Sequence, residues 1–406
     1  MIVLNHFQGR ASRSFLAFVA FALSFLYSCC RMPYEQGSLQ PEWETVIPTG
    51  TSGEIFYDGL PNMPKSGDLV IAHTTVRDEG FWAEDNRLCA INVNSGEISW
   101  YYPANLNEKH YAHFDAKGYS YSGKIVFQYA KNYKDDSSKW KITSLCLNAE
   151  NGLIIWEIDG ETPNSRRPSV GRKNDCFFSP DSCSVYKVDL NTDQIIDFYH
   201  TVSNDIYITD IALFDNYLVL SCCSDSVEEY QLETYVFIID ATTGQEVFNS
   251  YLGRCSVPPH CLLEKNILYA NVETYLTAID IRTGQRLWER DDRWAYTLFD
   301  MYIYKDVLLK CAGNATVGYD KVTGKILYDY RDYGSYYTTL EGQYAYLVNR
   351  RNEIDIIDVE TGTKLDKIVC PYGEIGFFGS YPVIYDNKMY VMGENRLFRY
   401  PTYPWH

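Results

Sequence analysis

The chain has 406 residues, with 36 Lys and Arg against 53 Asp and Glu, and a formal net charge of −17. This acidity argues against binding to nucleic acid and against adsorption to an anionic membrane, because both attract basic proteins. Aromatic residues make up 16% of the chain and include 36 Tyr, a composition typical of an all-β protein.

The N-terminal segment has the pattern of an export signal. Arg10 and Arg13 precede the apolar run Phe15–Tyr27, which is too short to span a bilayer and suits the core of a signal peptide. The run leads into Leu26-Tyr27-Ser28-Cys29, which resembles a bacterial lipoprotein signal, although Tyr27 is bulkier than that motif usually allows. The resemblance implies cleavage before Cys29 and lipid attachment to it; a signal peptide cut elsewhere and an uncleaved anchor are the alternatives. We therefore expect a signal peptide over 1–28, a lipidated Cys29 with a tether over 29–41, and a folded domain over 42–406.

A short pattern recurs along the folded domain: an apolar strand, an Asp or Asn, a Thr-Gly turn and then an aromatic residue. The clearest copy runs from Ala278 to Trp288 as AIDIRTGQRLW. We expect Asp280 to accept hydrogen bonds from the turn's own amides and Gly284 to take the positive φ that the turn needs. The turn then joins Leu276–Asp280 and Gln285–Trp288 as a hairpin. The other copies are Asn92…Gly96…Trp100, Asn148…Gly152…Trp156, Asp240…Gly244…Phe248, Asp320…Gly324…Tyr328, Asp358…Gly362…Leu365 and the degenerate Asp189…Asp193…Phe198.

Two further short strands precede each copy, which makes four strands in each unit. The nearer ones are expected at Asp68–His73, Lys124–Gln128, Tyr217–Cys222, Ile267–Asn271, Val307–Lys310, Tyr344–Val348 and Lys388–Met392, and a farther one at Ser380–Tyr385. Four-stranded units that repeat about every 40–50 residues indicate a β-propeller, which forms a single domain.

The closing residues give the number of blades. Seven units end at Trp100, Trp156, Phe198, Phe248, Trp288, Tyr328 and Leu365. Beyond them, Lys388–Met392 and Leu397–Tyr400 lack an outer strand, while Trp43–Val46 is an outer strand without inner partners. We therefore predict an all-β, eight-bladed β-propeller of four-stranded blades, in which the N-terminal strand closes the C-terminal blade. Seven blades are the alternative, because the degenerate copy can be merged with a neighbour.

The repeat, read as Ala-Ile-Asp-x-x-Thr-Gly-x-x-x-Trp, resembles that of the pyrroloquinoline quinone (PQQ)-like propellers, over residues 43–406. That family includes PQQ-dependent dehydrogenases and the propeller lipoprotein of the bacterial outer-membrane β-barrel assembly machinery, which binds no quinone and which this chain resembles more. The resemblance implies that the closing aromatics pack on the neighbouring blade. These blade-docking residues are Trp43, Trp100, Trp156, Phe248, Trp288 and Tyr328.

Twelve cysteines are many for an exported protein, where thiols tend to pair. Cys89 and Cys146 precede the repeat's Asn and read as small core residues. Two pairs are close enough in sequence to be bridged, Cys176 with Cys183 and Cys255 with Cys261, and no His/Cys spacing suggests zinc.

The adjacent pair Cys222-Cys223 resembles the vicinal disulfide that lies over the quinone in some PQQ-dependent alcohol dehydrogenases. Those enzymes carry insertions that supply Ca²⁺ ligands and a catalytic Asp, and no such insertion is visible. We thus expect no cofactor, with PQQ and Ca²⁺ as the alternative.

Besides the structural repeat, the sequence shows no recognisable catalytic motif. Its long loops are instead rich in aromatic residues. The loops that leave each outer strand and those that join the middle two strands share one face of a propeller. Tyr, Trp and Arg dominate binding hot spots, so this face is the candidate binding surface, although the same residues can plug the channel or cap blades. Its candidate residues are Trp82, Tyr102, Tyr111, Trp140, Trp294, Tyr296, Tyr333 and Tyr337.

Taken together, these features predict a non-enzymatic, lipid-anchored propeller of the bacterial cell envelope that acts as a protein-binding scaffold. We expect it at the outer membrane, on the periplasmic side, touching the membrane only through its anchor and binding an envelope or outer-membrane protein. A quinone-dependent redox enzyme and a carbohydrate-binding propeller are the alternatives.

Overall fold

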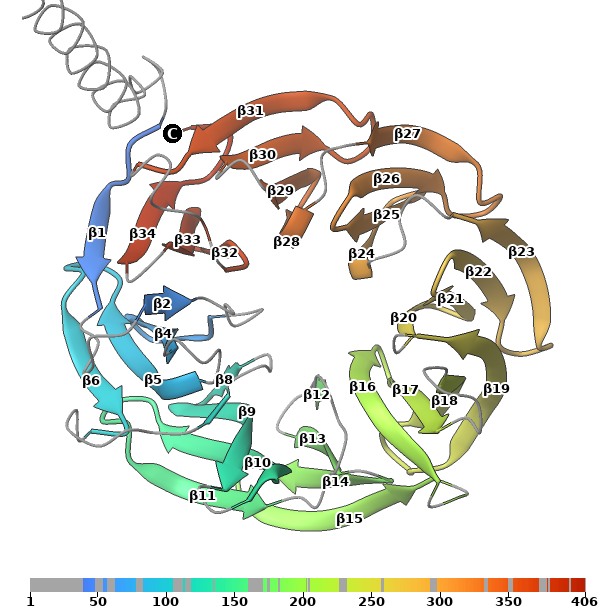
Figure 1. Cartoon of the computed structure of the whole chain (residues 1–406), viewed down its shortest axis with the longest axis horizontal. Coiled ribbons are helices and arrows are strands. Elements are labelled where there is room, and N and C mark those ends of the chain that lie inside the picture. Colours follow the sequence, from blue (N-terminus) through green and yellow to red (C-terminus); the bar gives the residue numbers. More distant parts are fainter. Residues whose placement is uncertain are drawn as a thin grey trace, which may run out of the picture.

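The computed structural model describes residues 39–47, 54–56, 63–77, 83–104, 112–113, 118–133, 136–159, 171–173, 176–181, 183–201, 203, 205–225, 232–256, 259–292, 298–331, 335–349, 353–371, 378, 380–393 and 396–405. The expected signal peptide, Cys29 and most of the expected tether lie outside these residues. Within them the fold is all β, as predicted, and the strands form eight sheets arranged in a ring (Figure 1).

We number the sheets along the chain; in each, the first strand lies nearest the axis of the ring and the last forms the rim (Figure 1). Sheet 1 holds β2 (Glu54–Phe56), β3 (Lys65–Ser66), β4 (Leu69–Arg77), β5 (Ala83–Asn92) and β6 (Ile98–Tyr102). Sheet 2 holds β7 (Ala112–His113), β8 (Tyr119–Tyr121), β9 (Lys124–Tyr133), β10 (Asp136–Asn148) and β11 (Ile154–Asp159). Sheet 3 holds β12 (Gly171–Lys173), β13 (Cys176–Asp181), β14 (Ser184–Asp189) and β15 (Gln194–His200). Sheet 4 holds β16 (Ile206–Phe214), β17 (Tyr217–Asp225), β18 (Leu232–Asp240) and β19 (Glu246–Cys255).

The second half of the ring follows the same plan. Sheet 5 holds β20 (His260–Glu264), β21 (Ile267–Val272), β22 (Tyr275–Asp280) and β23 (Gln285–Asp291). Sheet 6 holds β24 (Leu298–Tyr304), β25 (Val307–Ala312), β26 (Ala315–Asp320) and β27 (Ile326–Arg331). Sheet 7 holds β28 (Ser335–Glu341), β29 (Tyr344–Asn349), β30 (Glu353–Asp358) and β31 (Lys364–Val369). Sheet 8 holds β32 (Val383–Tyr385), β33 (Lys388–Gly393), β34 (Arg396–Pro401) and β1 (Trp43–Val46).

The N-terminal strand closes the ring, as predicted. Strand β1 pairs antiparallel with β34, with Trp43 opposite Arg399, and β1 lies beside the C-terminal sheet in Figure 1. Ion pairs reinforce the closure: Arg396 binds Glu44 at 2.7 Å and Arg399 binds Glu42 at 2.8 Å. The degenerate repeat copy has a sheet of its own, sheet 3, and is not merged with a neighbour.

The core lies between neighbouring sheets, since the middle strands are buried on both faces. All six residues of β25 are buried, which explains its nearly continuous apolar sequence. Leu309 and Cys311 of sheet 6 pack with Ala345 and Leu347 of sheet 7 in one such layer. Several strands continue beyond their predicted ends; β9, for example, runs to Tyr133, because its hairpin with β10 carries on past the repeat.

A β-bulge recurs in the outer hairpin of each sheet that carries the repeat. In sheet 5, Ala278 pairs with Trp288 but Ile279 pairs with Arg286, so that Leu287 is the extra residue and points outward. The extra residue aims the next side chain at the neighbouring sheet. Two predicted closing residues are displaced by it. Leu365 is the extra residue in sheet 7, which puts Asp366 in the closing position, and Phe198 is itself the extra residue in sheet 3.

The cysteines of the described residues form no disulfide. The bridges considered for Cys176 with Cys183 and for Cys255 with Cys261 are therefore not formed, while Cys89 and Cys146 are buried, as predicted. Burial raises the pKa of the Cys146 thiol to about 12. Over the described part of the chain, no helix has the length and apolar character needed to cross a membrane.

Candidate functional site

The closing aromatics lie at the seams between sheets, and four of them lie against the turn glycine of the next repeat. The Trp288 indole N–H donates to the Lys321 carbonyl at 3.1 Å, and a Cβ added to Gly324 would lie 2.7 Å from the Trp288 ring. Trp100 donates in the same way to Ala149 at 2.9 Å and covers Gly152. The remaining seams of this kind are those of Trp43, which donates to Val93 at 3.2 Å over Gly96, and Tyr328, which donates to Val359 at 2.6 Å over Gly362. The turn glycine thus has a second role that the sequence pattern did not reveal: it makes room for the ring of the preceding sheet.

Two closing aromatics make a different contact. Trp156 meets Asp193, which stands where the other copies have Gly, and its indole N–H donates to the Asp193 carboxylate at 2.9 Å. Lys124 binds the same carboxylate oxygen at 2.6 Å. Phe248 packs against the apolar layer between sheets 4 and 5, but nothing lies within 4 Å of a Cβ added to Gly284. The Phe248 ring therefore does not cover this glycine.

Of the predicted binding-face residues, Tyr102 and Tyr337 are described with their side chains. Tyr102 is half-buried and packs against the apolar layer between sheets 1 and 2. Tyr337 is half-buried on β28, with its ring 5.1 Å from that of Tyr381 in an edge-on arrangement. The backbone of Trp140 lies in β10, opposite Asn132, but its side chain lies outside the described part. The residues that fall wholly outside the described ranges are Trp82, Tyr111, Trp294, Tyr296 and Tyr333.

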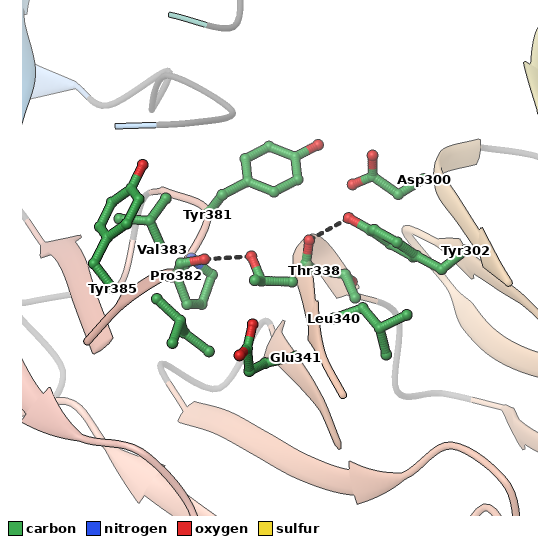
Figure 2. A pocket seen from close by; sticks show the side chains of 11 residues that line it. Asp300, Tyr302, Thr338, Leu340, Glu341, Tyr381, Pro382, Val383 and Tyr385 are labelled. Atoms are coloured by element: carbon green, nitrogen blue, oxygen red, sulfur yellow. Dashed lines mark hydrogen bonds between the residues drawn. The ribbon is translucent and has the colours of Figure 1, made fainter. Parts of the chain in front are cut away.

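A cavity of about 390 Å³ lies where the inner strands of three consecutive sheets meet. Its walls come from β24, β28 and β32, together with Tyr381 and Pro382 just before β32 (Figure 2). Sheets 7 and 8 are tied together beside it, since the Thr339 hydroxyl donates to the Pro382 carbonyl. Sheets 6 and 7 are tied by the Tyr302 hydroxyl, which donates to the Thr338 carbonyl. The cavity is therefore framed by fixed contacts between three sheets.

The chemistry of this cavity is acidic and aromatic. Asp300 and Glu341 line it, with the rings of Tyr302, Tyr381 and Tyr385, and none of the lining residues that the structure describes is basic. Figure 2 shows the Tyr381 ring extending toward Asp300. Burial, followed by the nearby Asp300 charge, raises the pKa of Tyr302 well above its usual value, so Tyr302 stays a neutral donor.

Sequence reasoning did not find this site, because its residues lie in the inner strands, which carry no recurring motif. Tyr337 was the nearest predicted residue, and it belongs to the same strand, β28. The sequence signal for this site is the run Tyr336-Tyr337-Thr338-Thr339, which combines aromatic and hydroxyl side chains. The sequence pattern predicts a loop up to Tyr337, whereas the structure has strand β28 there.

A second polar cluster missed by the sequence reasoning lies at the seam between sheets 5 and 6. Lys310 is completely buried on β25, and its ammonium lies 3.1 Å from the Asp292 carboxylate. The Tyr319 hydroxyl donates to the same carboxylate oxygen. Desolvation lowers the pKa of Lys310, and Asp292 opposes that effect. A lysine in the middle of an apolar strand was the signal for this cluster. We regard it as a structural ion pair between sheets, because each charged group is buried against its partner.

The residues present do not suit the quinone alternative. Cys222 is fully buried in the apolar layer between sheets 3 and 4, so it is not placed to cover a ligand near the axis of the ring. Burial, with nearby thiols, raises the pKa of Cys222 well above its usual value. Within the described ranges, no group of three His, Cys, Asp or Glu residues is arranged to hold a metal ion.

Comparisons with known proteins support the fold and no more. No family model matches the sequence, and no curated protein matches it either. Among solved structures, BamB from Moraxella catarrhalis is 13% identical with a TM-score of 0.57, covering 91% of this chain and 99% of that one. A europium-containing methanol dehydrogenase is 11% identical with a TM-score of 0.56, over 87% and 84% of the two chains. Saccharomyces cerevisiae Sqt1 is 11% identical with a TM-score of 0.58, over 87% and 100%. The chain therefore has the β-propeller fold, in agreement with its PQQ-like repeat.

Proposed function

We propose that this protein is a non-enzymatic binding propeller of the cell envelope, anchored at the periplasmic side of the outer membrane by a lipid on Cys29, and that it binds a protein partner. The anchor is supported by the sequence, in which Cys29 follows an apolar run of signal-peptide length. The observation that carries the binding role is the cavity between β24, β28 and β32.

This cavity is better suited to binding than the aromatic residues at the seams. Trp100, Trp288 and Tyr328 are engaged with the next sheet, so their rings serve the fold. Tyr302 and Tyr385 beside the cavity lie on the innermost strands, which face the axis of the ring, and Tyr381 lies just before β32 (Figure 1). Tyr offers a large apolar surface and a polar tip, which is why it is common in protein-binding hot spots.

A binding role is also favoured over the redox alternative. The redox alternative rests on the family resemblance and on Cys222-Cys223, and Cys222 is packed in the core away from the axis. The inner wall instead carries hydroxyl, carboxylate and aromatic groups, which recognise ligands through hydrogen bonds and packing.

The test is capture of a partner from envelope extract by cross-linking to the purified mature protein. We expect Tyr381→Ala to abolish a specific cross-link, while Tyr275→Ala, which removes a 45% exposed tyrosine from sheet 5, preserves it. Absence of any specific partner would overturn the binding role, as would micromolar binding of PQQ in the presence of Ca²⁺. Fatty-acid labelling tests the anchor: Cys29→Ser should lose the label, and a label retained on that variant would refute the assignment.

A further inference from the structure

We propose that Ser184, on the outer hairpin of sheet 3, is an activated nucleophile that accepts an acyl group from a carboxylic ester. The inference goes beyond the proposed binding role and does not depend on it. Three observations carry it: a chain of hydrogen bonds from Ser184 through His200 to Asp197, a backbone register that places the three side chains on one face, and their access to solvent.

The three side chains are joined by two short hydrogen bonds. The Nδ1 atom of His200 lies 2.8 Å from the Ser184 hydroxyl, and the Nε2 atom lies 2.7 Å from the Asp197 carboxylate. An ionised carboxylate can only accept, so Nε2 carries the ring proton and Nδ1 accepts from the Ser184 hydroxyl. The two ring nitrogens exchange places relative to the triad of serine proteases, but their roles as donor and acceptor are the same. This is the arrangement that activates a serine.

The pairing of β14 with β15 explains why the hydroxyl meets the imidazole. Ser184 begins β14 and lies opposite His200 at the end of β15. The Cys183 carbonyl accepts the Thr201 N–H at 2.8 Å, so Ser184 and His200 form a non-hydrogen-bonded pair, the type whose side chains lie closer together. Two strands therefore hold the nucleophile against its base.

The β-bulge of this hairpin brings in the carboxylate. Asp197 and His200 are three residues apart, and on a regular strand such residues point to opposite faces. In β15, however, Phe198 is the extra residue of the bulge, so Asp197 shares a face with His200. Phe198 and Tyr199 instead pack toward sheet 4, in the apolar layer that it forms with sheet 3. The bulge that displaces the closing position of this sheet thus completes the chain that begins at Ser184.

The site is open to a reactant, since the hairpin of β14 and β15 lies at the rim of the ring (Figure 1). The side chains of His200 and Asp197 are 62% and 53% exposed, and Ser184 is half-buried. At this exposure water screens the Asp197 charge, so its main role is to orient the ring. An open site gives little stabilisation to a poor leaving group. The reactant is therefore an activated ester, such as that of a phenol.

The acyl transfer balances within these residues. The Ser184 oxygen bonds to the carbonyl carbon of the ester while its proton passes to Nδ1 of His200. The bond between that carbon and the ester's bridging oxygen then breaks, and the departing oxygen takes the proton from His200. The products are an acyl ester of Ser184 and a free alcohol or phenol, with the imidazole neutral again.

The experiment treats the purified mature protein with p-nitrophenyl acetate, and measures nitrophenol release and, by peptide mass spectrometry, acetylation of Ser184. We expect a stoichiometric burst, which Ser184→Ala should remove. His200→Gln should slow acetylation of Ser184 about 100-fold, the lower end of the usual contribution of a general base. Ser95 is the internal control: it is exposed, but its hydroxyl donates to the Glu97 carboxylate at 3.5 Å, and it should stay unreacted.

Asp197 is a positioning residue, so its test also reads the state of the His200 ring. Asp197→Asn should slow acetylation at least about tenfold, because an amide can donate to Nε2 and favour the tautomer in which Nδ1 no longer accepts. Long-range ¹H–¹⁵N NMR should show the ring proton on Nε2 in the wild type and on Nδ1 in this variant. The matched control is Asp306→Asn, the same change at an exposed position of sheet 6, which should alter neither readout.

The variants change exposed or half-buried side chains, and a wild-type melting temperature separates lost reactivity from lost folding. Equal acetylation of Ser184 in His200→Gln would overturn the inference, as would a Ser184 no more reactive than Ser95, or acetylation that ends on His200 instead. Nitrophenol release that continues beyond the burst would support the activated serine and overturn the non-enzymatic function. Capture of a partner by a protein whose Ser184 does not react would overturn this inference alone.

Discussion

Two turns with nearly the same sequence differ in what lies above them. In sheet 5, Asp280 Oδ1 accepts the Arg282 N–H at 2.9 Å and Gly284 has a φ of 70°, as predicted for this turn. In sheet 6, Asp320 Oδ1 accepts the Thr323 N–H at 2.8 Å and Gly324 has a φ of 69°. Yet the Trp288 ring lies against Gly324, whereas the space over Gly284 is empty to 4 Å. The same motif thus closes a hairpin in both sheets but joins two sheets tightly at only one of them.

The largest effect is expected where a docking residue is removed together with its strand. Deleting 30–47 removes β1 and with it Trp43, whose ring lies 3.4 Å from a Cβ added to Gly96. The lost ladder bonds are worth about 0.5–1.5 kcal/mol each, and burial of a large side chain such as Ile47 about 1.5–3 kcal/mol. Thermal melting should show a loss of several degrees or more. The control deletes 30–38 and leaves every described contact of this strand in place; equal melting of the two truncations would mean that β1 is not the closure.

The glycines provide the sharpest comparison. Gly284→Ala should cost about 1–2 kcal/mol, which is the strain of a side chain at positive φ. Gly324→Ala should cost about 1–3 kcal/mol more, because its Cβ would overlap the Trp288 ring. Urea denaturation of both variants measures the difference in unfolding free energy. Equal losses would show that the Trp288 ring can move aside without an energetic cost.

A double-mutant cycle isolates the contact between the ring and the glycine. Trp288→Ala should itself cost about 1.5–3 kcal/mol through lost burial, at the lower end because the ring is half-buried. In that background Gly324→Ala should cost no more than Gly284→Ala does in the wild type, since no ring remains to be displaced. Additive costs would contradict this account of the seam.

The empty space over Gly284 suggests the opposite change. Phe248→Trp should reach the Gly284 turn and stabilise the protein by about 0.5–2 kcal/mol, by filling space and offering an indole N–H. Urea denaturation measures the gain. The control is Phe198→Trp, which faces a turn where the Phe198 carbonyl already lies 2.8 Å from a Cβ added to Gly244 and should give no gain.

The smallest effect concerns the charge of the turn carboxylates. Hydrogen bonds from Thr323 lower the pKa of Asp320, so this carboxyl contributes stability above the usual Asp pKa of about 3.9 and loses it as pH falls through the lower folded value. Asp320→Asn should therefore cost less than about 1 kcal/mol at pH 7, and the cost should shrink toward pH 3. Asn92 shows that an amide can fill this position, since its Oδ1 accepts the Asn94 N–H at 2.9 Å. Urea denaturation of the wild type and of Asp320→Asn at pH 7 and at pH 3 measures this loss of stability. A loss that is the same at both pH values would show that the charge of Asp320 does not stabilise the turn.

Much of the fold could be predicted because its signals are local. The spacing from Asp or Asn to Gly marks six of the outer hairpins, and the orphan strand Trp43–Val46 identified the closure that pairs it with β34. The bulge could not be predicted, since it depends on the register between two strands. It moved the closing position from Leu365 to Asp366, where the indole N–H of the C-terminal Trp405 donates to the carboxylate at 2.7 Å.

The candidate site was harder to predict because it is assembled from three sheets. Asp300, Glu341 and Tyr381 are far apart in the chain and belong to no repeated pattern. Their proximity follows only from the angle at which consecutive sheets meet. The prediction was placed on the aromatic loops instead. Of its residues that are described with their side chains, Tyr337 lies beside the cavity wall, through its contact with Tyr381.

The pairing of β1 with β34 also sets an order of events during biosynthesis. Trp43 emerges from the ribosome long before its partner Arg399, because the two residues are far apart in the chain. At roughly 5–20 residues per second, the N-terminal strand waits about 20–70 seconds for that partner. Seven sheets can form from the growing chain in sequence, while the eighth needs both β1 and β34. A chain cut short before β34 keeps an unpaired first strand, so the ring can close only after β34 has been made.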